Sequence, residues 1–249
     1  MIVFPLIATG VSLVFALLLL RQYAQRKRIS QLAWGIALAM YAIASMAVML
    51  GITQRWDPTL YRIFYLFGAM LNVPWLALGS IALFNKKPLS YGALGVVLAL
   101  SVFGLLRVIG AHVTDTITAS SAAGARIKNV FGGYQIPSGK DVWLNEPGVR
   151  SLAIYYSTIA YLVVVGIASY SSFTHGGRKP PQDRVRGNLL ISIGVTIVAI
   201  GSTALVRIGR GSVFSVTLAI GVATMFAGFL YASRAPKPSP PPEDAAEAA

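Results

Sequence analysis

The sequence predicts an all-α, polytopic integral membrane protein, a bundle of seven transmembrane helices. Of its 249 residues, 55% are hydrophobic and only 12% are charged, whereas a typical soluble domain has about 25% charged residues. The apolar residues also fall into runs that approach the ~20 residues a spanning helix needs. We place the spans at about residues 2–20, 31–51, 61–84, 89–110, 151–172, 188–207 and 213–232.

The first span is predicted to be a retained anchoring helix. It starts without the basic segment that opens a secretory signal peptide, and the basic cluster RQYAQRKR follows it instead. Because Lys and Arg gather on the cytoplasmic side, this cluster predicts an N-terminus outside and a C-terminus in the cytoplasm. The inner side then carries twelve Lys and Arg residues and the outer side nine. The predicted location is the plasma membrane.

The fourth and fifth spans are joined by a long external loop, residues 111–150. Its Val142, Trp143 and Leu144 form either a small lid or an anchor in the membrane interface. We favour the anchor, because tryptophan is enriched at that depth. The domain of seven helices covers residues 1–233. The Pro-rich, polar residues 234–249 form a tail that we expect to be disordered in the cytoplasm.

Helices 1–3 and 5–7 share an order of basic inner and Arg-bearing outer connections. This order is typical of a parallel duplication in a small transporter. It also arises in any protein of seven helices with an external N-terminus, so the sequence leaves the duplication open.

The spans lack the residues that most membrane chemistry requires. All acidic residues lie in loops or the tail, at Asp57, Asp115, Asp141, Glu146, Asp183, Glu243, Asp244 and Glu247. No span holds a lysine or histidine, and the chain has no cysteine. A proton-coupled pump normally carries ionisable groups within the membrane, and thiol chemistry requires cysteine. We therefore predict no catalytic residue, no metal and no cofactor.

Two broader classes are also disfavoured. In layout the chain is similar to the microbial rhodopsins, which attach retinal to a lysine of the seventh helix. The seventh run, VFSVTLAIGVATMFAGFLYAS, has no lysine, so covalent retinal is excluded on that resemblance. The net charge of +13 does not predict nucleic-acid binding, because the basic residues flank the apolar runs, where they meet anionic lipid.

Arginines are predicted at the outer ends of several helices, although basic residues normally avoid that side. They are Arg62, Arg107, Arg150, Arg207 and Arg210. Arginine binds phosphate and carboxylate with a bidentate fork, which suggests a site for an anionic lipid or a small acidic solute. Alternatively, these side chains snorkel to head groups or pair with loop acids, and we favour that alternative.

Polar residues also recur on three of the spans, on one face of the third and sixth and in the outer half of the fifth. At ~100° per residue, Tyr61, Tyr65 and Asn72 share a face of the third span. The sixth span has Ser192, Thr196, Thr203 and Arg207, and the fifth has Tyr155, Tyr156, Thr158 and Tyr161. Together they predict a polar cavity that opens outward. Its candidate residues are Tyr61, Tyr65, Asn72, Arg107, Tyr155, Thr158, Thr196, Thr203 and Arg207. Packing between helices is the alternative role for the Ser and Thr side chains.

The third span also carries Pro74, which we expect to kink it. Proline has no N–H, so the carbonyl of Met70 loses its helical partner. A freed carbonyl in hydrocarbon must be satisfied by a neighbour or by water. Asn72 lies at the same depth, near the midplane. It either binds a ligand or bonds another helix and holds the kink.

Three functional hypotheses follow. The first is a non-enzymatic protein with an outward-opening polar cavity, which acts as a small permease, lipid handler or ligand sensor. The second is an accessory or scaffold subunit with a membrane partner protein. The third is an interfacial enzyme that uses the external loop, where His112 lies near Asp115, Asp141 and Glu146.

Overall fold

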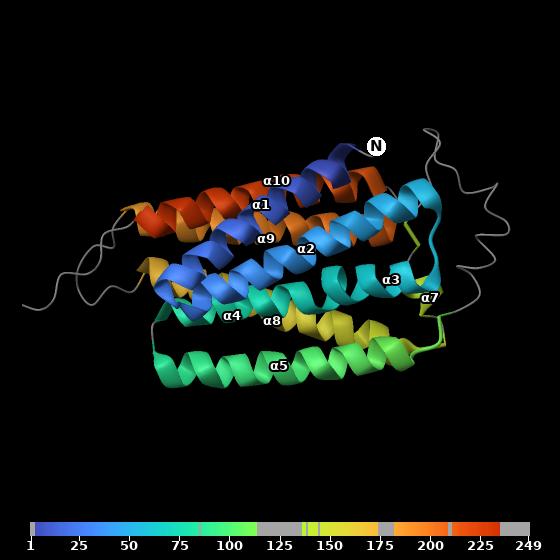
Figure 1. The fold of residues 1–249 in the computed structure, drawn as a ribbon, viewed down its shortest axis with the longest axis horizontal. Helices are drawn as coiled ribbons and strands as arrows, with labels where there is room; N and C mark the ends of the chain where they lie inside the picture. Colours follow the sequence, from blue (N-terminus) through green and yellow to red (C-terminus); the bar gives the residue numbers. More distant parts are fainter. Residues whose placement is uncertain are drawn as a thin grey trace, which may run out of the picture.

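The computed structural model describes residues 3–84, 86–113, 136–137, 139–143, 145–173, 182–208 and 211–234. Within these ranges the chain is helical apart from short connections, which confirms the predicted all-α class (Figure 1). The elements are α1 (Val3–Arg26), α2 (Ile29–Gln54), α3 (Pro58–Phe64), the π-helix η1 (Tyr65–Leu71), α4 (Asn72–Ile81), the 3-10 helix η2 (Ala82–Phe84), α5 (Lys87–Gly110), α7 (Gly139–Val142), α8 (Pro147–Phe173), α9 (Gln182–Ile208) and α10 (Gly211–Arg234).

Among the described residues, five helices are long and apolar enough to cross a membrane. They are Pro5–Arg26, Ile29–Gln54, Pro58–Phe84, Lys87–Gly110 and Pro147–Ile167. The described parts of α9 and α10 hold shorter apolar stretches, Leu189–Gly201 and Ala219–Gly228. The chain therefore has the features of a membrane protein, while the count of seven spans and the orientation remain predictions.

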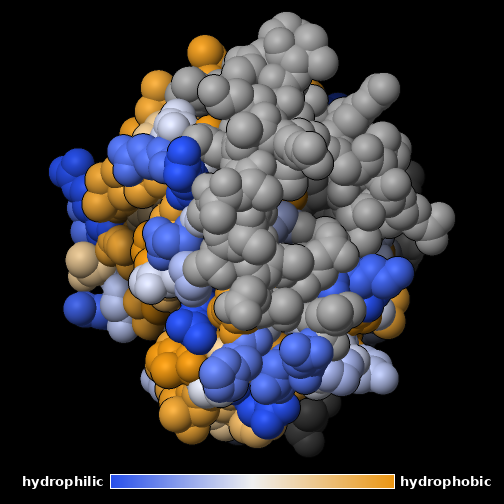
Figure 2. Space-filling view, turned by 90° about the vertical axis from the view of Figure 1, so that its right-hand side faces the viewer, coloured by the Kyte–Doolittle hydropathy of each residue, from blue (hydrophilic) through white to orange (hydrophobic). Residues whose placement is uncertain are grey.

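The long helices lie side by side in one bundle, and consecutive ones run in opposite directions (Figure 1). We call the end where α1 begins and α7 lies the α7 pole. Figure 2 looks onto this pole, where hydrophilic and hydrophobic side chains both reach the surface. The predicted external loop leaves the bundle at this end, although residues 114–135 lie outside the described ranges.

The third long helix begins at Pro58, three residues before the predicted start. Asp57 is the N-cap, and its Oδ1 accepts hydrogen bonds from the backbone N–H groups of Thr59 at 2.8 Å and Leu60 at 2.9 Å. Proline at the first helical position has no N–H to leave unsatisfied. Asp57 therefore starts α3, the role that acidic side chains commonly take at a helix N-terminus.

The predicted irregularity at Pro74 takes the form of a π-helix. The seven residues Tyr65–Leu71 are π-helical, and regular α-helix resumes at Asn72. A proline ring clashes with the carbonyl four residues earlier, and the wider π-helix relieves such a clash. The distortion therefore lies before Pro74. The suggested repeat does not reproduce it, because α10 is continuous α-helix from Gly211 to Arg234.

Helices α9 and α10 approach each other most closely at glycines. A methyl group built on Gly194 would lie 2.6 Å from the carbonyl oxygen of Gly221 and 2.7 Å from the backbone nitrogen of Met225. One built on Gly228 would lie 2.6 Å from the carbonyl oxygen of Gly187. The backbones themselves are in contact, an arrangement that only small residues permit in membrane helices.

Candidate functional site

The third long helix is hydrogen-bonded to α8 at its π-helical segment, η1. Ser157 Oγ donates a 2.7 Å hydrogen bond to the carbonyl oxygen of Ala69, in η1. We predicted either a neighbour or water as the partner of the Met70 carbonyl, and the observed donor reaches the adjacent carbonyl, that of Ala69. Ser157 was not among the predicted site residues, although it lies beside Thr158, which was a candidate. A shift of one residue turns a side chain by about 100° around a helix, and that shift decides which of the two faces the bundle.

Substitution of Ser157 by alanine is expected to destabilise the bundle by about 1 kcal/mol, because a half-buried carbonyl then loses its donor. Thr158→Ala is the matched control, since Thr158 is exposed on the same helix. Unfolding in mixed detergent micelles measures both variants. Equal stabilities would show that the bond to Ala69 does not hold the break.

Asn72 is buried, with 6% of its surface exposed, at the first residue of α4. Among the residues that the structure describes, no side chain forms a hydrogen bond with its amide. The predicted role in which Asn72 bonds another helix therefore has no observed partner within that part of the chain. The ligand role stays a prediction.

Tyr61 and Tyr65 lie in an aromatic cluster at the α7 pole. We define the aromatic cluster as Trp56, Tyr61, Phe64, Tyr65 and Trp143. The ring of Tyr61 stacks on that of Tyr65 with centroids 5.9 Å apart. Both tyrosine side chains are buried. They are thus covered at the α7 pole.

Trp143 provides that cover. Its ring centroid lies 5.3 Å from Tyr65 and 6.0 Å from Tyr61, and only 1% of its surface is exposed. A methyl group on Gly139 would lie 3.1 Å from Cε2 of Tyr65, so α7 itself packs on the cluster. The interpretation of Trp143 as an interfacial anchor was wrong, because an anchor exposes its ring to lipid head groups. Val142 is buried as well, and Leu144 lies outside the described residues.

Two arginines lie at the first turn of α8, shortly after this segment: Arg150 belongs to the turn, and Arg107 approaches it. Nη2 of Arg107 lies 2.9 Å from the position of a methyl group on Gly148. Arg150 is close enough for its charge to act on Tyr65. The first turn of a helix carries a partial positive charge, so this corner of the α7 pole is electropositive.

Arg62 has a structural partner. Its Nη2 donates a 2.9 Å hydrogen bond to the carbonyl oxygen of Ala111, the C-cap of α5. This bond joins α3 to the end of α5. The side chain of Arg207 and residue Arg210 lie outside what the structure describes.

The face of α8 that we predicted to line the cavity needs correction. Tyr155 is 63% exposed, and Thr158 is also exposed, so both point away from the bundle. Tyr156 and Tyr161 point inward instead. Tyr156 donates to the carbonyl oxygen of Leu100 at 3.1 Å, and Tyr161 shares a 3.1 Å hydrogen bond with Thr196. The predicted group spanned too wide an angle to share one face.

On α9, Thr196 therefore serves a contact between helices. Besides Tyr161, it bonds the carbonyl oxygen of Ser192 at 2.8 Å. The side chain of Thr203 is outside the described set.

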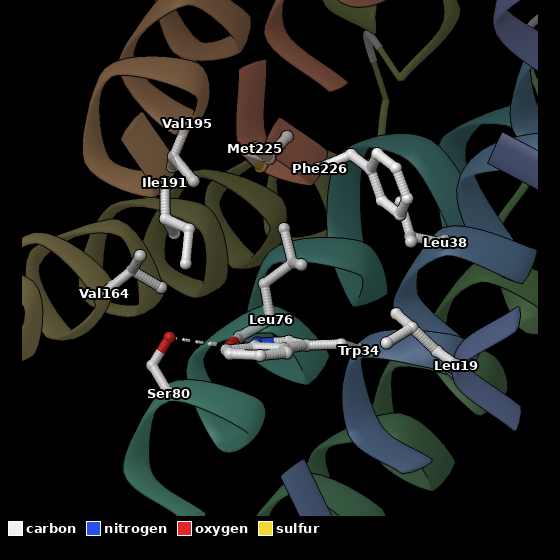
Figure 3. A pocket seen from close by; sticks show the side chains of 10 residues that line it. All are labelled: Leu19, Trp34, Leu38, Leu76, Ser80, Val164, Ile191, Val195, Met225 and Phe226. Atoms are coloured by element: carbon white, nitrogen blue, oxygen red, sulfur yellow. Dashed lines mark hydrogen bonds between the residues drawn. The ribbon is translucent and has the colours of Figure 1, made fainter. Parts of the chain in front are cut away.

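An apolar cavity of about 40 Å³ lies between the helices (Figure 3). Its lining residues place it in the half of the bundle away from the α7 pole. Its lining comes from six helices: Leu19, Trp34, Leu38, Leu76, Ser80, Val164, Ile191, Val195, Met225 and Phe226. Trp34 Nε1 and Ser80 Oγ both donate to the carbonyl oxygen of Leu76, at 3.2 and 3.1 Å. None of the predicted site residues lines this cavity.

For the interfacial-enzyme hypothesis the described residues offer little. His112 is exposed, Glu146 is half-buried, and Asp115 lies outside the described ranges. Within the described part of the chain, no cluster of His, Asp and Glu side chains fits a metal ion. No protein-family model, curated protein or solved structure matches the chain.

Proposed function

We propose that the protein is a non-enzymatic plasma-membrane protein that binds an anionic ligand at its α7 pole, which faces outward. The ligand is an anionic lipid head group or a small acidic solute, and the protein acts as a lipid handler or ligand sensor. Residues 139–143 form the lid of the site. The observation that carries the proposal is the burial of Trp143 against Tyr61 and Tyr65.

Side-chain packing holds the lid in place, while one buried hydrogen-bond donor in it has no acceptor among the described residues. Within the described residues, Nε1 of Trp143 is buried without a hydrogen-bond acceptor. A buried donor without an acceptor costs about 1–3 kcal/mol. A ligand that accepts from this N–H, or that lets the ring turn outward, recovers that free energy. The closed lid is thus poised to respond to a ligand.

The charge at this corner selects the ligand. Arg150 belongs to the first turn of α8, Arg107 approaches that turn at Gly148, and the lid ends at residue 143, shortly before the turn. Arginine forks bind phosphate and carboxylate, and a helix N-terminus favours anions. The lid and the two arginines therefore serve one site.

The proposal is tested by fluorine NMR on protein labelled with 5-fluorotryptophan in phosphatidylcholine nanodiscs. Trp143→Phe assigns the resonance of Trp143. We expect this resonance to shift saturably with either inorganic phosphate or dihexanoyl phosphatidylglycerol, and the more effective probe distinguishes a solute from a lipid. Arg150→Gln should weaken the response about tenfold, because a hydrogen bond to a charged group contributes about 1.5–3 kcal/mol.

Arg186→Gln is the matched control, because Arg186 is an exposed arginine near the start of α9, at the opposite end of the bundle. Its response should equal that of the parent protein. If neither anionic probe moves the Trp143 resonance, or if dihexanoyl phosphatidylcholine moves it equally, the proposed anion site is wrong.

A further inference from the structure

Several polar side chains lie on the helix stripes that line the apolar cavity, but closer to the α7 pole. Ser12 is seven residues before Leu19, Tyr41 is seven after Trp34, and Ser45 is seven after Leu38. Residues seven apart lie on nearly the same face of a helix. In the same way, Asn72 precedes Leu76 by four residues and Ser157 precedes Val164 by seven. Polar side chains thus continue these helix stripes from the cavity toward the α7 pole.

The packing of α1 on α2 brings the first of these groups to one depth. Gln31 of α2 donates to Gln22 of α1 at 3.2 Å, and a methyl on Gly35 would lie 3.5 Å from Cβ of Leu19. Two turns away from this contact, toward the α7 pole, α1 has Ser12 and α2 has Ala42. Ser12 therefore lies level with Tyr41, the neighbour of Ala42.

The packing of α2 on the third long helix brings in Asn72. Trp34 bonds the carbonyl of Leu76, and a methyl on Gly68 would lie 3.1 Å from Cβ of Ala44. Between these two contacts the antiparallel register sets Tyr41 level with Met70 and Leu71, close to Asn72. This is also where the π-helix ends.

Three of these groups are buried without a hydrogen-bond partner among the described residues: Ser12 Oγ, Tyr41 Oη and Ser45 Oγ. The exposed fractions of the three residues are 0%, 4% and 2%. Ser and Thr in membrane helices normally bond a backbone carbonyl of their own helix. Ser80 and Ser90 do so. Tyr41 and Ser45 are one turn apart on α2, about 6 Å along its axis. Three unsatisfied hydroxyls within about one helical turn of depth instead indicate a common ligand.

We infer that the axis of the bundle binds a small uncharged amphiphile, with its polar end on Ser12, Tyr41, Ser45 and Asn72 and its apolar end in the cavity beneath them. Hydroxyl and amide groups both donate and accept, so they suit an alcohol or an amide. A charged ligand is disfavoured, because the sequence has no acidic residue or lysine in any span and an unpaired charge in hydrocarbon is costly. A short aliphatic chain fits the apolar walls.

The absence of cysteine from the chain permits a direct test with single-cysteine variants in nanodiscs. The reagent is methyl methanethiosulfonate, which is itself small and uncharged, and mass spectrometry follows the labelled fraction with time. Ser45→Cys and Ser12→Cys should be labelled about tenfold faster than Ala44→Cys, because only a thiol in a polar space ionises. Ala44 is equally buried on α2 but packs on Gly68. Addition of 1-butanol should slow the labelling of both serine variants.

Leu106→Cys controls for reagent dissolved in lipid, since Leu106 is an apolar residue that is 65% exposed on α5. The inference is overturned if the serine variants react no faster than Ala44→Cys or Leu106→Cys. Fast labelling that 1-butanol leaves unchanged also overturns it, because the space then holds only water. The two serines lie on different helices, so misfolding of one variant leaves the other to decide. Unfolding of each variant in detergent verifies the fold.

Discussion

Substitution of Trp143 by alanine is expected to destabilise the α7 pole by about 3–5 kcal/mol, the usual range for removing a buried Trp ring. The ring is 1% exposed and covers Tyr61 and Tyr65. Its removal leaves a gap over both tyrosines that the short helix α7 cannot fill. Titration with sodium dodecyl sulfate in mixed micelles measures the free energy of unfolding. Limited proteolysis should also cleave the connection before α8 faster in the variant.

Two variants control this prediction. Trp143→Phe keeps an aromatic ring and should lose much less stability. Asn145→Ala changes an exposed residue of the same connection and should be neutral. If Trp143→Ala is as stable as Asn145→Ala, the ring does not hold the segment in place, and the lid proposed for the anion site loses its basis.

Among substitutions that add a single methyl group, we expect Gly194→Ala to reduce the stability of the protein strongly. The new methyl would meet the carbonyl oxygen of Gly221 at 2.6 Å and the backbone nitrogen of Met225 at 2.7 Å. A side chain can turn away from such a clash, but a backbone cannot, so α9 and α10 must separate. We expect a loss of about 3 kcal/mol, at the upper end for overpacking.

Gly166→Ala is the matched control, because a methyl at Gly166 meets nothing within 4 Å. Alanine has the higher helix propensity, so this variant should gain up to about 0.5–1 kcal/mol. The two substitutions add the same atoms to long helices and are expected to change stability in opposite directions. Unfolding in detergent that shows equal effects would mean that α9 and α10 are not held at this spacing in the membrane.

The elements of the fold follow from the sequence because hydrocarbon allows few alternatives. A run of apolar residues in a bilayer must satisfy its own backbone, and a helix does so within the segment. The predicted span 89–110 accordingly corresponds to α5, Lys87–Gly110, with an end at the same residue. The position of Pro74 likewise predicted the irregularity in the third long helix. Proline has no backbone N–H wherever it occurs, so its effect on a helix does not depend on the tertiary structure.

The side chains that meet could not be read from the sequence, because small rotations of a helix decide them. Thr158 was a candidate and Ser157 was not, yet Ser157 bonds Ala69 and Thr158 is exposed. Trp143 posed a similar problem. The ring has the same chemistry at a membrane interface and in a buried cluster, and only the packing of α7 on Tyr65 decides between them.

By itself, then, the sequence determined an all-helical membrane protein, the approximate ends of its spans and the position of its break, because hydrophobicity and proline act locally. The tertiary structure alone decided that the tyrosine stripe is covered by Trp143, that the apolar cavity lies away from it, and that the hydroxyls of Ser12, Tyr41 and Ser45 are buried without a hydrogen-bond partner among the described residues. These facts depend on the register between helices, which is set by contacts such as Ala44 on Gly68. Register is a property of pairs of segments, and no single segment encodes it.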